Sequence, residues 1–389
     1  MALCLANSLL ARKDFCPYDQ LVRYKWWYQL GYMSSTGECF DIGNATRDSI
    51  ETFCRRQERL MKKENIAEAD IDYLDDPQLL KDFNVKCSQS GVAGNGALMR
   101  LAPVPLFFFR YPAIAVEYSG ISGEITHGDI KAYDACRYYA ALIVGVFQGI
   151  SKDQLLDRSF CSKHKDWFSG KPLCPEIQRI ADGSFKRERG YDDGIRGKGY
   201  IVNALEAALW AFWSDNNSFE KGALAAVNLG DDTDTTAAIY GQLAGALYGY
   251  RKLRGNWLKY VYAHEFMLNL SKWIAFEGEN WKSEKDRSLS SDATSYQAAT
   301  NASYNSNQYQ GDTNPTGRAQ GTNKPRESQR RNDDTRSSDY TSGQTLGLQT
   351  LQRISSANYA GHNSGYGKKN NFKITMILII FFFKIILHL

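Results

Sequence analysis

The sequence predicts an all-α fold for residues 1–280, followed by a C-terminal region of a different composition. Apolar residues recur at steps of three and four, which is the period of a helix with one buried face. Long runs that alternate between apolar and polar residues, as in β-strands, are lacking. Hydrophobic residues make up 43% of the 389 residues, which is enough for a sizeable core. We therefore expect one helical domain over residues 1–280.

Two segments show the helical period most clearly. The expected apolar face of residues 201–213 consists of Val202, Leu205, Leu209 and Phe212. A second helix should begin after Asp129, because Asp is a good N-cap, and should end at Gly149, because Gly favours helix ends.

The C-terminal region divides into two parts. Residues 290–345 contain no Leu, Ile, Val, Met, Phe, Trp or Cys, so burial cannot offset the entropy of ordering them. We predict a disordered low-complexity tail over residues 281–371. Residues 372–389 are strongly apolar but fall short of the ~20 apolar residues that a spanning helix needs. They are either a tail anchor that contacts a membrane or an artefact of the gene model, and we favour the artefact.

Charge and cysteine content narrow the class of protein. The 47 Lys and Arg residues are scattered among 43 Asp and Glu residues, so we expect no nucleic-acid partner. The 8 cysteines form no C-x-x-C pair, and no signal peptide is recognisable at Met1. We expect reduced thiols and a cytoplasmic protein.

An acidic segment is the strongest candidate for chemistry. Asp231, Asp232 and Asp234 lie within four positions, beside the hydroxyl of Thr235. Three carboxylates so close together repel one another unless a cation or solvent intervenes. Oxygen-only donors suit Mg²⁺ better than Zn²⁺. The alternative is that Asp234 only caps the following helix, which does not explain the other acids.

Two further polar segments are candidates for ligand contacts. The loop of residues 31–47 contains Asp41 and Asn44, which are spaced to contact one sugar or one water, although either could instead cap the next helix. The segment of residues 91–100 carries three glycines around Asn95. Its free N–H groups and a following helix N-terminus would favour a pyrophosphate. His127 stands alone at a helix start and, judged by itself, is structural.

In this order, the segments resemble the ADP-ribosylglycohydrolase family, which includes the dinitrogenase-reductase-activating glycohydrolases and the J1 crystallins. The resemblance covers about residues 1–275. The matching strings are SSTGECFDIGNATR, GNGALMRLAPVPL, the helix opened by Thr126 and His127, GYIVNALEAALWAFW, and NLGDDTDTTAAIYGQLAGALYG.

The resemblance implies a compact orthogonal bundle of helices around two Mg²⁺ ions and hydrolysis of the bond between ADP-ribose and its acceptor. It implies that the metal ligands are Asp232, Asp234 and Thr235. It implies that Asp41 and Asn44 act at the ribose and the scissile bond. It implies that the ADP-ribose cleft includes Gly94, Asn95, Gly96 and His127. The partner would be an ADP-ribosylated protein or a small ADP-ribose conjugate, bound by a monomer, and the acceptor linkage stays open between arginine, serine and others.

One departure from the family pattern concerns the beginning of the chain. Family members begin with a Gly-Asp-x-x-Gly segment and a Thr-Asp-Asp motif that supply further metal ligands. This chain begins at Met1 with what looks like the helix that follows those motifs. We therefore expect weak Mg²⁺ binding and little or no hydrolysis, from a truncated gene model or a degenerate copy. The alternative function is a non-catalytic ADP-ribose-binding or crystallin-like structural protein.

Overall fold

The computed structural model describes residues 1–284 and 286–287. These residues form α-helices and short 3₁₀ helices, and no β-strand occurs among them. The nearest feature to a sheet in this part is one isolated antiparallel bridge between Gly94 and Tyr200. The all-α prediction is therefore confirmed. The predicted tail beyond residue 287 and the apolar segment of residues 372–389 lie outside the described residues.

The α-helices (α) and 3₁₀ helices (η) follow one another along the chain. The first part contains α1 (Ala2–Arg12), α2 (Pro17–Leu30), α3 (Asn44–Glu64), η1 (Ile71–Tyr73) and α4 (Pro77–Asp82). The middle part contains α5 (Gly96–Met99), α6 (Pro103–Phe107), α7 (Pro112–Glu124), α8 (Ile130–Phe147), α9 (Lys152–Leu155), α10 (Phe160–Lys163), η2 (Lys165–Phe168) and α11 (Pro175–Ala181). The last part contains η3 (Gly190–Asp193), α12 (Ile201–Ser214), α13 (Phe219–Val227), α14 (Thr233–Tyr248), η4 (Tyr250–Lys252), α15 (Gly255–Leu258) and α16 (His264–Asn280).

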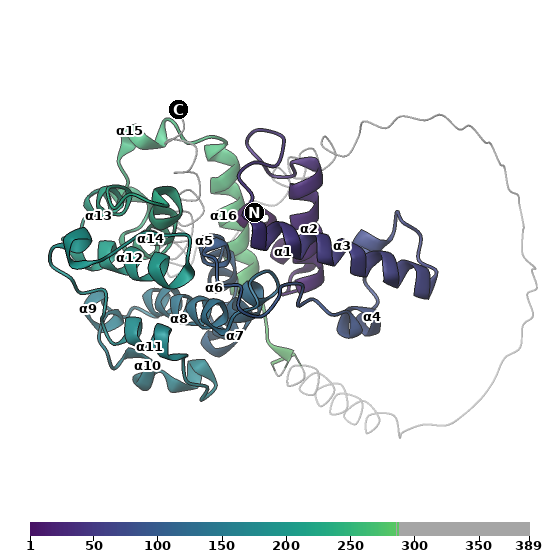
Figure 1. Ribbon diagram of the computed structural model, residues 1–389, viewed down its shortest axis with the longest axis horizontal. Helices are drawn as coiled ribbons and strands as arrows, with labels where there is room; N and C mark the ends of the chain where they lie inside the picture. The colour runs from purple at the N-terminus through teal and green to yellow at the C-terminus, as the bar shows by residue number, and fades with distance from the viewer. Residues whose placement is uncertain (285, 288–389) are drawn as a thin grey trace, which may run out of the picture. The chain divides into compact units, whose positions relative to one another are not determined.

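Met1–Trp281 belong to one compact unit. Within it, α5 to α8 lie between a group formed by α12, α13 and α14 and a group formed by α1, α2 and α3 (Figure 1). Helix α8 is buried along most of its length and contacts α7, α12 and α14. It begins as the sequence predicts, because the Asp129 carboxylate accepts the N–H of Lys131 at 2.8 Å.

Close helix packing at the centre depends on glycine. A Cβ on Gly120 would lie 2.6 Å from the ring of Tyr133, and one on Gly123 would lie 2.8 Å from Sγ of Cys136. Both glycines belong to α7 and both neighbours belong to α8, so even one methyl group would force these helices apart. The first turn of α8, which follows His127, is held in place by this contact.

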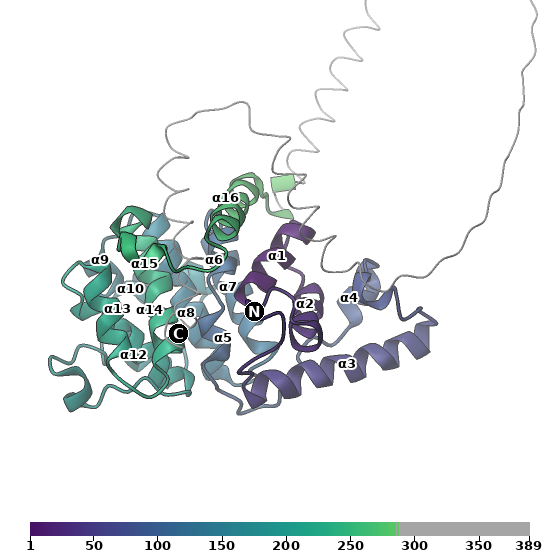
Figure 2. The same ribbon diagram turned by 90° about the horizontal axis from the view of Figure 1, so that it is seen from above.

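The last described helix returns to the beginning of the chain. Helix α16 contacts α1 and α6, as seen from above in Figure 2. A Cβ on Gly278 would lie 2.5 Å from the carbonyl oxygen of Phe107, so α16 approaches α6 at backbone distance. None of the described helices is long and apolar enough to cross a membrane.

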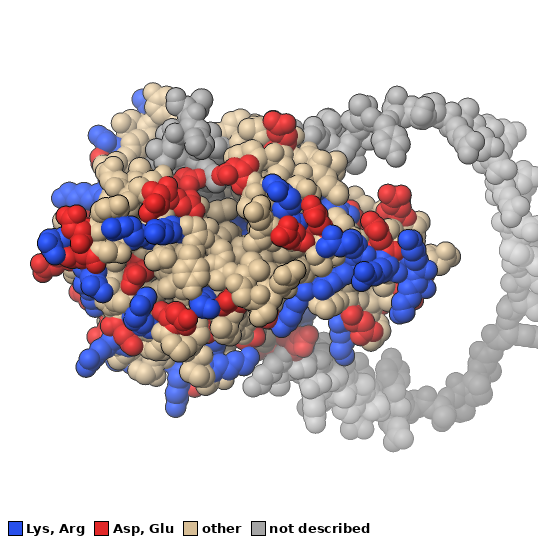
Figure 3. Space-filling view, in the orientation of Figure 1, with Lys and Arg blue, Asp and Glu red and all other residues tan. Residues whose placement is uncertain are grey.

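Charges of both signs are interspersed on the face shown in Figure 3, and basic side chains gather over α3. The basic residues of α3 are Arg47, Arg55, Arg56, Arg59, Lys62 and Lys63. The same helix carries the acids Asp48, Glu51, Glu58 and Glu64. Arg55, Arg59 and Lys62 follow one another at steps of four and three, so these basic side chains share one face of α3.

Candidate functional site

The acidic segment lies at the start of α14. Asp232 is the N-cap residue, yet its side chain does not cap the helix. Asp234 lies inside the first turn, so the alternative in which Asp234 caps the helix is wrong. Asp231 is exposed and adopts a left-handed backbone with φ of 58°. Capping of α14 therefore does not explain either carboxylate.

The Asp232 carboxylate contacts the glycine-rich segment instead. Its Oδ2 accepts a hydrogen bond from Nδ2 of Asn95 at 2.7 Å. Asn95 is 8% exposed and its own N–H donates to the carbonyl of Gly199 at 2.9 Å. The N–H of Asp232 donates to the carbonyl of Gly197 at 2.7 Å. The structure thus brings together two predicted site segments through a third segment, residues 197–200.

The two acids influence each other. Burial raises the pKa of Asp232, and the neighbouring Asp234 carboxylate raises it further, while hydrogen bonds from Asn95 and Thr235 oppose the shift. Thr235 is buried and its hydroxyl lies 3.6 Å from the sulfur of Met99. In the part of the chain that the structure describes, no group of three or more His, Cys, Asp and Glu side chains is arranged to hold a metal ion.

His127 lies directly beneath the glycine-rich segment. A Cβ on Gly94 would lie 3.2 Å from its Nε2, and one on Gly96 would lie 3.3 Å from the same atom. Any larger residue at either position would press on the imidazole. Burial, and to a lesser extent the charge of Arg100, lower the pKa of His127 to about 3, so the ring is neutral at pH 7.

The first turn of α3 also reaches this region. Thr46 Oγ1 lies 3.6 Å from where a Cβ on Gly96 would be, and the Ser49 hydroxyl donates to the carbonyl of Thr126 at 3.1 Å. Asn44 is the first residue of α3, with Gly43 as its N-cap, and Asp41 lies in the preceding loop. The alternative in which Asp41 or Asn44 caps this helix is therefore wrong. Both side chains are exposed.

The structure corrects one expectation about the glycine-rich segment. Helix α5 contains only four residues, Gly96–Met99, so it cannot provide the helix dipole that we expected to attract an anion. The positive charge beneath this segment belongs to Arg100, which is 1% exposed and donates from Nη1 to the carbonyl of Gly96 at 2.8 Å.

The sequence analysis gave no role to several residues that build the site. They are Tyr24, Arg100, Thr126 and residues 197–200. The two glycines at positions 197 and 199 were the available signal, because such spacing is typical of backbone that approaches other backbone closely. A Cβ on Gly197 would lie 2.4 Å from Oγ1 of Thr236 in α14.

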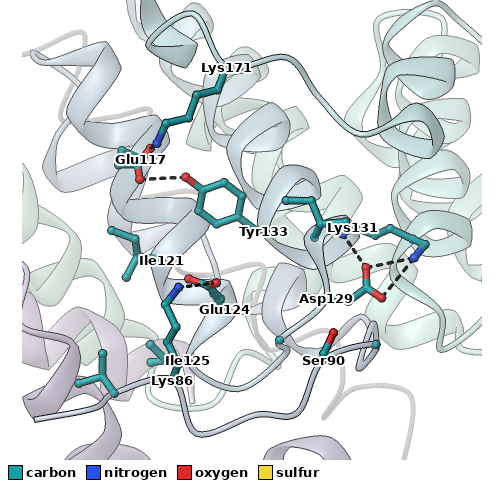
Figure 4. A pocket seen from close by; sticks show the side chains of 14 residues that line it. Lys86, Ser90, Glu117, Ile121, Glu124, Ile125, Asp129, Lys131, Tyr133 and Lys171 are labelled. Carbon is teal, nitrogen blue, oxygen red and sulfur yellow. Dashed lines mark hydrogen bonds and ion pairs between the residues drawn. The ribbon is translucent and has the colours of Figure 1, made fainter.

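A cavity of about 680 Å³ adjoins the glycine-rich segment. Figure 4 shows it between the end of α7 and the start of α8, with Ser90 at one edge. Three ion pairs line it: Lys86–Glu124 at 2.8 Å, Lys131–Asp129 at 3.1 Å and Lys171–Glu117 at 3.5 Å. The N–H of Asp129 donates to the carbonyl of Val92 at 3.2 Å, so the backbone after His127 forms the wall between cavity and site.

Comparisons with known proteins show which proteins the chain is similar to. The chain is 35% identical over 264 residues to the ADP-ribosylarginine hydrolase Tri1 of Pseudomonas putida, which covers 67% of this chain and 60% of the relative. It is 31% identical to the ADP-ribosylarginine hydrolase Tri1 of Serratia proteamaculans, covering 71% of this chain and 65% of the relative. The matches thus span less than two thirds of the length of these relatives.

A solved structure and a family model extend the comparison. A chain of an ADP-ribosylglycohydrolase-related protein complex matches with a TM-score of 0.53 and 33% identity, over 71% of this chain and 79% of that one. The ADP-ribosylglycohydrolase family model matches residues 1–284, which include all the site segments described above. This chain therefore belongs to the ADP-ribosylglycohydrolase family.

Proposed function

We propose that the protein is a Mg²⁺-dependent hydrolase that removes ADP-ribose from arginine side chains of proteins. The observation that carries the proposal is the hydrogen bond between Asn95 and Asp232, which joins the glycine-rich segment to the acidic segment. The arginine linkage is supported by the names of the Pseudomonas and Serratia relatives. We propose a cytoplasmic monomer.

The donors at the start of α14 fit a magnesium ion. Asp232, Asp234 and Thr235 offer only oxygen, and the two carboxylates are close enough for each to disfavour the charge of the other. A cation beside them would remove that penalty. When bound there, Mg²⁺ would polarise a ribose hydroxyl or a water molecule. Because these donors form only one side of a coordination sphere, we expect weak Mg²⁺ affinity.

The remaining residues suit the other parts of the ligand. The backbone at Gly94 and Gly96 lies against His127, because a Cβ on either glycine would be 3.2–3.3 Å from its Nε2, and this backbone and the imidazole would contact a pyrophosphate. In the reaction, the bond from ribose C1 to the guanidinium nitrogen breaks and a water oxygen bonds to C1. We propose that Asp41, in the loop before α3, and Asn44, the first residue of α3, contact the ribose and that water.

The test is release of ADP-ribose from an ADP-ribosylated arginine peptide by the 389-residue chain, with Mg²⁺ or with EDTA. We expect slow release that EDTA abolishes. Changing Asp232 and Asp234 together to Asn should reduce the rate by about 100-fold or more, because even outer-shell metal contacts are worth 10–100-fold. The matched control is Asp231→Asn, since Asp231 is exposed and Asn tolerates its left-handed backbone.

Two outcomes would contradict the proposal. Release that EDTA leaves unchanged would exclude a role for Mg²⁺. Tight binding of ADP-ribose, measured by calorimetry, without any release in Mg²⁺ would favour the alternative of a non-catalytic binder.

A further inference from the structure

In the part of the chain that the structure describes, the fully buried Arg100 has no carboxylate partner, and it lies next to the candidate site. Arg100 is 1% exposed, and its Nε donates to the hydroxyl of Tyr24 at 2.9 Å. Its Nη1 donates to the carbonyl of Gly96, and its Nη2 donates to Oγ1 of Thr126. The partners of the guanidinium, Tyr24, Gly96 and Thr126, are all neutral groups. Burying an ion without a counter-charge destabilises a fold, so packing alone does not explain this cation.

The arginine determines which way the hydroxyl of Thr126 points. A guanidinium only donates hydrogen bonds, so Oγ1 of Thr126 must accept from it. Thr126 is fully buried, and a buried hydroxyl proton needs an acceptor of its own. The other partner that the structure gives Oγ1 is Nδ1 of His127, at 2.9 Å. The hydroxyl therefore donates to Nδ1.

This donation fixes the tautomer of His127. A neutral imidazole carries one proton, and a ring whose Nδ1 accepts a hydrogen bond carries that proton on Nε2. Burial keeps the ring neutral at pH 7 by lowering its pKa to about 3. Nε2 is the atom nearest to Gly94 and among the nearest to Gly96. The donor edge of the imidazole thus faces the glycine-rich segment.

We propose that Arg100 and Thr126 are positioning residues that hold His127 as its Nε2–H tautomer, so that the imidazole donates a hydrogen bond to an anionic pyrophosphate oxygen of the ligand. The inference rests on the proposed function for the identity of that ligand. Arg100 has a second effect, because its uncompensated charge provides a fixed positive potential beneath the same oxygen. This replaces the dipole that the four-residue helix α5 is too short to supply.

The tautomer can be measured directly. The chain contains 5 histidines, so long-range ¹H–¹⁵N correlation spectra of the labelled full chain should resolve each ring, and His127→Gln assigns the signal that disappears. The expected signal is that of a neutral Nε2–H ring that does not titrate between pH 5 and 8. An Nδ1–H ring or an imidazolium at pH 7 would overturn the inference.

Variants of Thr126 separate positioning from simple packing. Thr126→Val keeps the shape and removes the hydroxyl, whereas Thr126→Ser keeps the hydroxyl. Thr126→Val should give a mixture of tautomers and bind ADP-ribose about 5-fold more weakly, the loss expected for one hydrogen bond. Thr126→Ser should restore both properties. Equal spectra and equal affinities for Thr126→Val and the unchanged protein would refute the inference.

Arg100 is tested by Arg100→Lys, which keeps the charge without the forked donors, and by Arg100→Met, which removes both. We expect Lys to retain more ADP-ribose affinity than Met, and circular dichroism identifies any variant that fails to fold. The two proposals fail separately. If the chain keeps the Nε2–H tautomer and binds ADP-ribose but hydrolyses nothing, the proposed function is refuted and the positioning role of Arg100 and Thr126 is not. If the chain hydrolyses its substrate but His127 carries its proton on Nδ1, the positioning role is refuted and the proposed function is not.

Discussion

The contact between Asn95 and Asp232 is most sharply tested by Asn95→Asp, which replaces a donor with a second carboxylate. The Asn95 amide nitrogen lies 2.7 Å from Oδ2 of Asp232, so a new carboxylate oxygen would lie at nearly the same distance. Asn95 is 8% exposed, so water screens the pair mainly from the side of Asp232. The variant therefore introduces like-charge repulsion at the centre of the site.

Two energies limit how much stability Asn95→Asp can lose. At the 2.7 Å separation and an effective dielectric constant of about 20, two unit charges repel by about 6 kcal/mol. Binding one proton removes the repulsion and costs about 4 kcal/mol at pH 7 for a carboxyl with a reference pKa of about 3.9. The smaller of these two energies, about 4 kcal/mol, is therefore the largest loss of stability that the repulsion can cause. With solvent screening at Asp232, we expect the free energy of unfolding to fall by about 1–3 kcal/mol at pH 7.

The pH dependence identifies the cause. The folded variant holds a carboxyl whose pKa is raised above its unfolded value, so the folded state binds more protons and its stability falls as the pH rises. Near pH 5 the largest possible loss of stability is only about 1.5 kcal/mol, because protonating the carboxyl costs less free energy at that pH. Urea unfolding at pH 5 and pH 7.5, followed by circular dichroism, measures the difference. Asn95→Ala is the uncharged control, and an equal loss for Asn95→Asp at both pH values would refute the reasoning.

Three further predictions concern Asp215, the glycines at positions 197 and 199, and the binding of Mg²⁺. Asp215→Ala should lower the free energy of unfolding by about 3–5 kcal/mol in urea unfolding, because it removes a fully buried carboxylate that lies 2.6 Å from the partly buried ammonium of Lys152 and accepts from the hydroxyls of Tyr240 and Tyr248. Gly197→Ala should lower the free energy of unfolding by about 1–3 kcal/mol, because its Cβ would clash with α14. Gly199→Ala, whose Cβ would have open space around it, should lower the free energy of unfolding by under about 0.5 kcal/mol. Mg²⁺ should raise the melting temperature of Asn95→Asp more than that of the unchanged protein, because the added carboxylate supplies another ligand; equal shifts would argue against a cation at this place.

Local signals predicted the helices well. Asp129 and Gly149 carry the capping chemistry that starts and stops α8, and the structure confirms a helix over Ile130–Phe147. The apolar period of residues 201–213 likewise corresponds to α12. These predictions succeed because the cause lies within a few residues of its effect.

The site was less predictable because its contacts are remote in sequence. Asn95 and Asp232 are 137 positions apart, and Arg100 reaches Tyr24 across 76 positions. Periodicity and capping rules contain no information about such pairs. Local reasoning also failed at α3, where both polar candidates offered a side-chain cap and the helix instead begins after Gly43.

Charges of opposite sign contact Asn95 and its neighbour Gly96, and this polarity restricts how a ligand can bind. The Asp232 carboxylate, which Asp234 influences, accepts a hydrogen bond from the Asn95 side chain, whereas the guanidinium of Arg100 donates to the carbonyl of Gly96. ADP-ribose has a pyrophosphate that is anionic and a ribose that becomes cationic as its bond breaks. Only one orientation pairs each of these charges with its opposite. Under the proposed function, the ribose therefore lies at the acidic pair, where a bound Mg²⁺ would polarise a ribose hydroxyl or a water molecule, and the pyrophosphate lies toward Arg100.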